Sequence, residues 1–70
     1  MKRTQVESKD IKSIGYDDKT LSLEVEFNSG SIYVYFKVPK NIYIEFMEAD
    51  SHGKFFHRNI KNKFEYKKLD

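Results

Sequence analysis

Residues 21–27 constrain the fold of this chain more than any other segment, because apolar and polar side chains alternate there without a break. A period of two is typical of a β-strand that buries one face and leaves the other wet. The next three residues, Asn28-Ser29-Gly30, indicate a hairpin turn. Residues 31–38 are rich in β-formers and apolar on both faces, so they predict the partner strand. We therefore expect an antiparallel hairpin at the centre of the fold.

Residues 11–16 predict another strand before this hairpin, with Ile14 and Tyr16 on one face and Ile11 out of phase near the strand start. The segment Asp17-Asp18-Lys19-Thr20 is typical of a turn, since an Asp side chain can bond its own backbone there. Together the three strands predict an antiparallel meander.

The hydrophobic period changes after Pro39, which ends the third strand and is tolerated in the first turn of a helix. From there to Ala49 the apolar residues recur at helical spacing, which predicts a first helix. Residues 51–62 predict a second helix, which Ser51 or the residue before it can cap. Residues 64–66 alternate again and indicate a short C-terminal strand. The order predicts an α+β fold, a three-stranded antiparallel meander followed by two short helices packed on one face.

The chain has 70 residues and a mass of 8.4 kDa, which allows one small domain. We assign residues 10–70 to this domain and expect the polar residues 1–9 to form a flexible leader. The sequence has no cysteine, so it can form neither a disulfide nor a zinc site with thiolate ligands. No apolar run is long enough to cross a membrane, and no signal-peptide pattern follows the basic start. We expect a cytoplasmic protein that binds no membrane.

The length of the hairpin loop decides which side chains of the third strand face the core, because a shift of one residue reverses the two faces. A two-residue loop would leave Tyr33 and Tyr35 on the outer face. A three-residue loop, which includes Asn28, would turn both tyrosines to the core and place an apolar stripe outside: Ile32, Val34 and Phe36. Gly30 suits the left-handed third position of the longer loop, whereas the shorter loop would strain Ser29. We therefore expect the three-residue loop.

Each register predicts a different function for the outer face of the sheet. Outward tyrosines at positions 33 and 35 would form a platform on which nucleic-acid bases stack. An outward stripe of Ile32, Val34 and Phe36 would be an apolar patch that binds a protein partner or a second copy of the chain. In either register a loop, the leader or the C-terminal segment could instead cover this face.

The second predicted helix carries a basic stripe at positions i, i+3, i+4 and i+7: Lys54, His57, Arg58 and Lys61. Residues 51–70 hold six basic and two acidic side chains, so their net charge is +4. With Lys63 close behind, such a stripe could follow a phosphate backbone. The solvated outer face of an amphipathic helix has the same pattern. We treat Tyr33, Tyr35 and the five residues of this basic group as candidate nucleic-acid-binding residues.

No pattern in the sequence points to catalysis, a metal or a cofactor. His52 and His57 are five residues apart and share no helical face, which is not the spacing of a metal-binding pair. The three glycines are far apart and do not form a phosphate-binding loop. We therefore expect a protein that is not an enzyme, with no catalytic residue, no metal and no cofactor.

Residues spread along almost the whole chain, from about 6 to 69, resemble the KTSC domain family. The matching positions are, in order, Ser8, Ile11, Ile14-Gly15-Tyr16-Asp17, Leu21, Val25, Phe27, Gly30, Ile32-Tyr33, Tyr35, Val38-Pro39, Ala49, Ser51, Gly53, Phe55-Phe56, Ile60-Lys61, Phe64 and Tyr66. The tyrosine pair at 33 and 35, the Val38-Pro39 step and the Ala-x-Ser-x-Gly run are fairly specific in this order. Val34 and Phe36 are apolar at positions that the family leaves free, which strengthens the case for a partner-binding stripe. Phe64 stands where the family usually has Tyr.

The resemblance implies a module that is found at the C-terminus of some lysyl-tRNA synthetases and also as a separate small protein. RNA binding is suggested by the synthetase context, and aminoacylation is not implied, because the synthetase's catalytic domain has no counterpart here. Residues and resemblance together predict a small non-catalytic binding module with RNA or tRNA as its partner. The alternative is a protein-interaction or homodimerisation module that uses Ile32, Val34 and Phe36.

Overall fold

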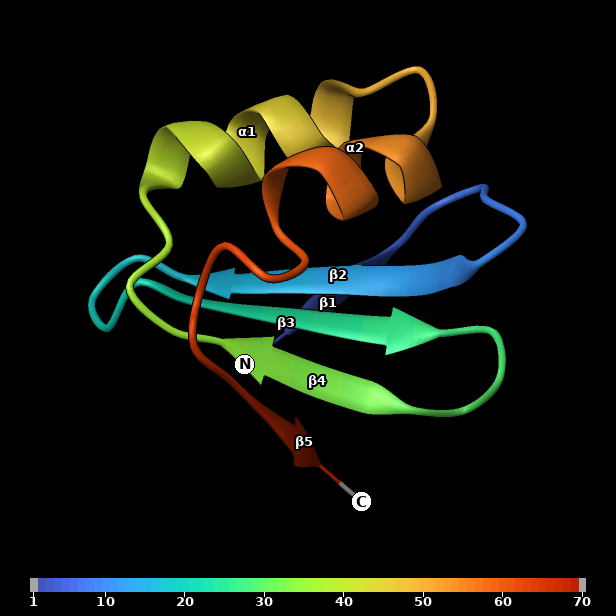
Figure 1. Cartoon of the computed structure of the whole chain (residues 1–70). Coiled ribbons are helices and arrows are strands. Elements are labelled where there is room, and N and C mark those ends of the chain that lie inside the picture. The colour runs from blue at the N-terminus through green and yellow to red at the C-terminus, as the bar shows by residue number, and fades with distance from the viewer. Residues whose placement is uncertain (1, 70) are drawn as a thin grey trace.

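The computed structural model of the chain describes residues 2–69, and Met1 and Asp70 lie outside the described residues. The described part folds into one antiparallel five-stranded sheet with two helices on one face, which confirms the predicted α+β class (Figure 1). The strands are adjacent in space in the order in which they occur in the sequence. The elements are β1 (Arg3–Gln5), β2 (Ile11–Asp17), β3 (Ser22–Phe27), β4 (Ile32–Tyr35), α1 (Lys40–Glu48), α2 (His52–Asn59) and β5 (Tyr66–Leu69).

The pairing of β3 with β4 has the register of the three-residue hairpin loop, as predicted. Val25 lies opposite Tyr33 and Leu23 lies opposite Tyr35. Gly30 occupies the third loop position with a φ of 101°, a conformation that favours glycine. The two tyrosines therefore point to the helix-covered side of the sheet, and Ile32 and Val34, which alternate with them, point to the other side.

The first strand lies within residues 1–9, for which the sequence predicted a flexible leader. Arg3–Gln5 pair antiparallel with β2, and Arg3 lies opposite Gly15. A side chain at Gly15 would lie 2.9 Å from the Cγ of Arg3 and from the carbonyl oxygen of Lys2. The sequence pattern missed this strand because its side chains are polar and the pairing depends on a close approach to glycine in β2.

A β-bulge in β2 explains why Ile11 is out of phase with Ile14 and Tyr16 in the sequence. The register with β3 shifts between Ile11 and Ser13, so that one extra residue is accommodated there. As a result Ile11 is buried together with Ile14, although the spacing between them does not fit a regular strand.

The two helices begin where the sequence predicted, but α2 ends earlier. Ser51 caps α2, and its Oγ accepts a hydrogen bond from the backbone N–H of Lys54 at 3.3 Å. The prediction of a helix over 51–62 was too long, because α2 stops at Asn59. The N–H groups of residues 60 and 61 both donate to the carbonyl oxygen of Phe56, and Asn62 has a φ of 64°. The chain thus turns away from the helix axis before Lys61.

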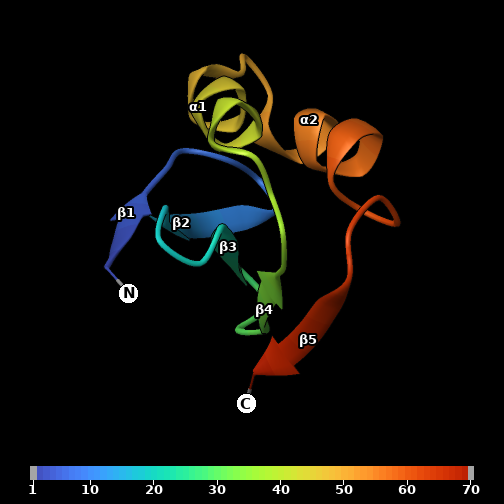
Figure 2. The same cartoon turned by 90° about the vertical axis from the view of Figure 1, so that its left-hand side faces the viewer.

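The C-terminal strand is longer and later than the predicted segment 64–66. Tyr66–Leu69 pair with β4, and the N–H of Phe36 donates to the carbonyl oxygen of Glu65 at 2.9 Å. The third predicted strand, 31–38, is correspondingly shortened to Ile32–Tyr35, because Lys37 has a φ of 57° and ends the regular pairing. Figure 2 shows β1 and β5 as the two edges of the curved sheet.

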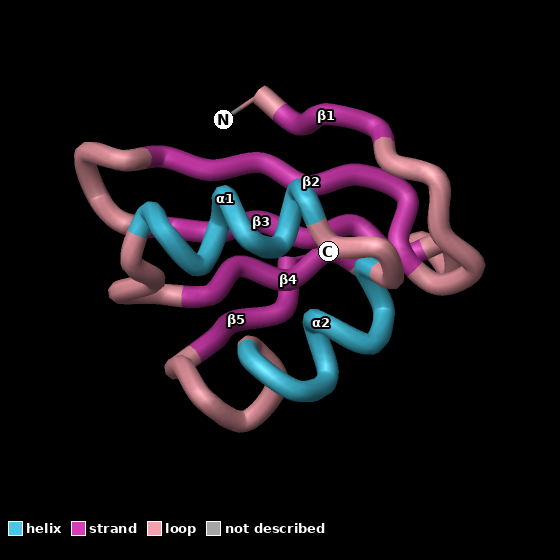
Figure 3. Tube along the Cα trace, turned by 90° about the horizontal axis from the view of Figure 1, so that it is seen from above, coloured by secondary structure: helices cyan, strands magenta, loops and turns pink. Residues whose placement is uncertain are grey.

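The hydrophobic core lies between the sheet and the helices. Its fully buried side chains include Phe46 of α1, which lies among apolar residues of β2 and β3. Seen from above, α1 lies over the middle strands and runs roughly along them, while α2 lies on the side of the sheet that carries β4 and β5 (Figure 3). The inner face of β4 and β5 is nevertheless incompletely covered near the hairpin end of the sheet.

Candidate nucleic-acid interface

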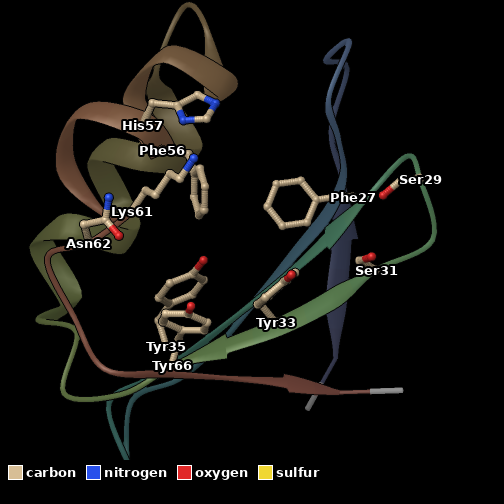
Figure 4. Close-up of a pocket in the computed structure, with 10 residues that line it drawn as sticks. All are labelled: Phe27, Ser29, Ser31, Tyr33, Tyr35, Phe56, His57, Lys61, Asn62 and Tyr66. Atoms are coloured by element: carbon tan, nitrogen blue, oxygen red, sulfur yellow. The ribbon is translucent and has the colours of Figure 1, made fainter.

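A cavity of about 340 Å³ lies where α2 fails to cover the inner face of β4 and β5 (Figure 4). Tyrosine and phenylalanine rings line most of it, and a few polar and basic side chains line its rim. The lining residues are Phe27, Ser29, Ser31, Tyr33, Tyr35, Phe56, His57, Lys61, Asn62 and Tyr66. A concave, largely aromatic site with a few convergent polar groups is the usual form of a ligand-binding site.

Three tyrosines form the floor of this cavity. Tyr33 and Tyr35 project from the same face of β4, and Tyr66 comes from the facing position on β5. The ring centroid of Tyr66 lies 5.7 Å from that of Tyr33 and 5.6 Å from that of Tyr35. Tyr66 is 56% exposed, whereas Tyr35 is 4% exposed. Ring surface is therefore open to a ligand mainly at Tyr66 and the half-buried Tyr33.

Two phenylalanines support the tyrosines through edge-to-face contacts. The ring of Phe56 in α2 meets Tyr35 at 5.6 Å and Phe27 at 5.3 Å, with interplanar angles of 76°. Phe27 also meets Tyr33 edge-on at 5.8 Å. Such contacts are favourable and fix the ring orientations. The aromatic surface is therefore held in place before any ligand arrives.

The phenol groups of the floor supply unused hydrogen-bonding capacity. Within residues 2–69, no side-chain hydrogen bond involves the hydroxyl of Tyr33, Tyr35 or Tyr66, although the hydroxyl of Tyr16 donates to the carbonyl oxygen of Val38 at 2.6 Å. Burial raises the pKa of Tyr35 to about 12, and the neighbouring phenols of Tyr33 and Tyr66 add to the rise. Tyr35 is thus a neutral hydroxyl at physiological pH.

A polar wall stands on the α2 side of the floor. His57 comes from α2, and Lys61 and Asn62 come from the turn that follows it (Figure 4). The side chain of Lys61 points to the same side of the cavity as His57 (Figure 4). α2 ends at Asn59, so Lys61 lies in the turn and not on the helix.

The structure brings together four of the seven candidate nucleic-acid-binding residues in one cavity. Tyr33 and Tyr35 point inward, yet they line an open cavity with His57 and Lys61. The prediction that one helix carries the whole basic stripe is wrong for Lys61, because Lys61 lies beyond the end of α2 at Asn59. Of the three remaining candidates, Arg58 and Lys63 are exposed outside the cavity, and Lys54 lines a different hollow.

Sequence reasoning missed several residues of this cavity. Tyr66 was assigned to a short extended segment without a role, and Asn62 was placed inside a helix. Nothing local to either residue indicates the cavity, since the alternation at 64–66 predicts a strand but not its pairing with β4. Phe56 belongs to the buried core and Phe27 packs against it, and both also line the cavity.

A second hollow, of about 440 Å³, lies between residues 7–10 and the start of α2. Glu7, Asp10 and Asp50 line it together with lysines, so it is poorly suited to a phosphate. The Nε2 atom of His52 is buried there without a hydrogen-bond partner among the described residues. Across residues 2–69, no group of three or more His, Asp or Glu side chains is arranged to hold a metal ion. No helix in the same range is long and apolar enough to cross a membrane.

The opposite face of the sheet is half polar and half apolar. On its polar half, Arg3 of β1 forms an ion pair with Glu24 of β3 and donates a hydrogen bond to the Oγ of Ser13 of β2 at 3.1 Å. On β4 the stripe predicted to face outward does so: Ile32 and Val34 are half-buried, and Phe36 is 38% exposed.

The comparisons with known proteins agree with this fold. The sequence model of the KTSC domain family matches residues 7–64. A lysine–tRNA ligase of Trichormus variabilis is 48% identical over 59 residues, which are 84% of this chain and 10% of the ligase. An uncharacterized protein of Stutzerimonas stutzeri is 39% identical over 71 residues and is matched along 100% of its length. A KTSC domain protein from Yersinia pestis has a crystal structure with a TM-score of 0.94 at 41% identity, covering 99% of this chain and 97% of that one.

Fold and cavity define a small α+β domain that carries an aromatic hollow beside a basic helix end. The chain belongs to the KTSC domain family, because the family model matches residues 7–64 and a relative that is 39% identical aligns with it along the whole length of both chains. It spans about 10% of the length of the lysine–tRNA ligases that it matches.

Proposed function

We propose that this protein is a non-catalytic RNA-binding module whose binding site is the aromatic cavity. Bases stack on the exposed ring surfaces of Tyr33 and Tyr66, and Lys61 and His57 contact the phosphates. The observation that carries this proposal is the meeting of open tyrosine rings and a lysine ammonium in one cavity of about 340 Å³. Proteins that bind single-stranded nucleic acid commonly combine aromatic side chains, on which bases stack, with basic side chains that contact the phosphates.

The charge distribution and the relatives support the same function. Residues 51–70 carry a net charge of +4, so α2 and the segment after it attract a polyanion. Arg58 and Lys63 are exposed and extend the phosphate contact beyond the cavity, with Lys54 at the start of α2 in a weaker, peripheral role. The lysine–tRNA ligases that contain a similar segment act on tRNA, which makes tRNA the first RNA to test. A cytoplasmic location fits this function.

An NMR titration of the labelled protein with a single-stranded RNA pool, and then with tRNA, tests the proposal at low and physiological salt. We expect shifts at Tyr33, Tyr66, His57 and Lys61, and weaker binding at the higher salt concentration. Lys61→Ala should weaken binding, whereas the control Lys19→Ala removes the same charge from an exposed turn distant from the cavity and should not. A titration without shifts at either salt concentration would overturn the proposal.

A second candidate function rests on the register of β4. Ile32, Val34 and Phe36 face away from the helices, and Phe36 is 38% exposed, as a protein-interaction or homodimerisation surface requires. Light scattering over a range of concentrations tests this candidate. A mass that rises with concentration and returns to that of a monomer in Phe36→Ser would support it, and a constant monomer mass would count against a homodimer.

A further inference from the structure

We infer that the cavity takes a single unpaired nucleotide, flipped out of any stack, rather than a run of stacked bases or a duplex edge. This inference rests on the proposed function and deepens it, because it names the state of the RNA that is bound. It follows from the size of the cavity, the side chains that stand on two sides of its floor and the kind of atoms that line it.

The cavity is small and walled on two sides. Its volume of about 340 Å³ is near the lower end of the range of about 300–1,000 Å³ for small-ligand sites. Phe27 stands on one side, and Lys61 and Asn62 stand on the other (Figure 4). The bases inside a duplex are already stacked on both faces and cannot stack on the tyrosine rings of this floor, whereas an extruded base has its faces free.

The lining offers each part of one nucleotide a suitable partner. The base has the open rings of Tyr66 and Tyr33 to stack on. The edge of the base can form hydrogen bonds with the unpartnered phenol groups of the floor and with the amide of Asn62, since these groups both donate and accept. The phosphate has the Lys61 ammonium, which lies at the rim and not beneath the rings. One base and one phosphate thus use the polar groups that the cavity presents.

The test compares two RNA duplexes of the same sequence, one fully paired and one with a single unpaired nucleotide in a bulge. We expect the bulged duplex to bind about tenfold more tightly, since one stacked base contributes about that much. A nucleoside 5′-monophosphate, used alone, should shift the NMR signals of Tyr33 and Tyr66, whereas inorganic phosphate should shift only the signals near Lys61.

Variants of Tyr66 separate stacking from folding. Tyr66→Phe keeps the ring and should retain the preference for the bulged duplex, whereas Tyr66→Ala should reduce it about tenfold. Phe36→Ala is the matched control, because it removes an exposed aromatic ring from the opposite face of the sheet. Because Tyr66 lies on an edge strand and is 56% exposed, both variants should remain folded, which their NMR spectra will show.

The outcomes distinguish the inference from the proposed function. Equal, salt-dependent binding of both duplexes would overturn the single-nucleotide inference and leave RNA binding intact. Absence of binding to either duplex, to single-stranded RNA and to tRNA would overturn both. A preference for the bulge that Tyr66→Ala leaves unchanged would place the stacking site elsewhere and overturn the inference.

Discussion

Tyr35 of β4 lies directly opposite Tyr66 of β5, and their ring centroids are 5.6 Å apart. Tyr35 is fixed in the core by Phe56, so the pair joins a rigid ring to an exposed one. Through this relationship the C-terminal strand completes the floor of the cavity. The candidate site therefore exists only when residues far apart in the sequence have paired.

Tyr35 should make the stability of the protein depend on pH in the alkaline range. Its pKa is about 12 in the folded state and close to 10.0 in the unfolded chain, so the unfolded state releases the proton first. The stabilisation is complete below pH 10 and is lost as the pH rises toward 12, by at most about 3 kcal/mol. Urea denaturation over this range measures the loss.

Tyr35→Phe is the control for this pH dependence. It keeps the ring and removes the titrating group, so its unfolding free energy should fall less between pH 10 and 12 than that of the parent protein. Tyr16, whose pKa is raised by burial and by Asp18 and Asp17, titrates in both proteins and cancels in the comparison. Parallel pH profiles for the two proteins would contradict the prediction.

Gly30→Ala should destabilise the hairpin through the backbone alone. The residue has a φ of 101°, and an added Cβ would meet no atom within 4 Å. The expected loss is therefore the conformational cost of a left-handed L-residue, about 1–2 kcal/mol. Urea denaturation of Gly30→Ala and of the neighbouring control Ser29→Ala should show the loss only in the first variant. An unchanged midpoint for Gly30→Ala would mean that the loop can adopt another conformation.

The hairpin and the helix starts were predictable because their signals are local. The alternation in residues 21–27 and the position of Gly30 specify the register of β3 and β4, and Ser51 specifies the start of α2. These features depend on a few neighbouring residues whose conformational preferences agree. The inward direction of Tyr33 and Tyr35 follows from the same register.

The cavity was not predictable, because it depends on where elements end and which distant segments meet. α2 ends at Asn59 and places Lys61 in a turn at the cavity rim, yet no glycine or proline marks that end. The edge strand β1 is polar and short, so its own sequence does not indicate pairing, and the alternation at 64–66 indicates a C-terminal strand but not its extent to Leu69 or its partner β4. The sequence analysis also expected inward tyrosines to lie in the core, whereas Tyr33 is only half-buried and lines the open cavity.

Gly15→Ala should loosen β1 without unfolding the domain. The added methyl group would lie 2.9 Å from the Cγ of Arg3 and from the carbonyl oxygen of Lys2, so the strand must move away. Hydrogen exchange should accelerate at Arg3–Gln5 while the amides of β3 remain protected. Ser13→Ala, which removes a hydroxyl that bonds Arg3 and Glu26 but adds no bulk, is the comparison. Unchanged protection of Arg3–Gln5 in Gly15→Ala would show that β1 tolerates the added group.

Phe46→Ala should unfold most of the molecules, because this side chain is fully buried at the centre of the core. Its ring is stacked on that of Phe55 at 5.6 Å, and its removal would leave a large cavity between α1 and the sheet. Such a change costs about 3–5 kcal/mol, comparable to the whole stability of a domain this small. Thermal unfolding followed by circular dichroism measures the loss. Ile44→Ala changes a 44% exposed residue of the same helix and should leave the midpoint nearly unchanged, so equal losses in the two variants would contradict the assignment of Phe46 to the core.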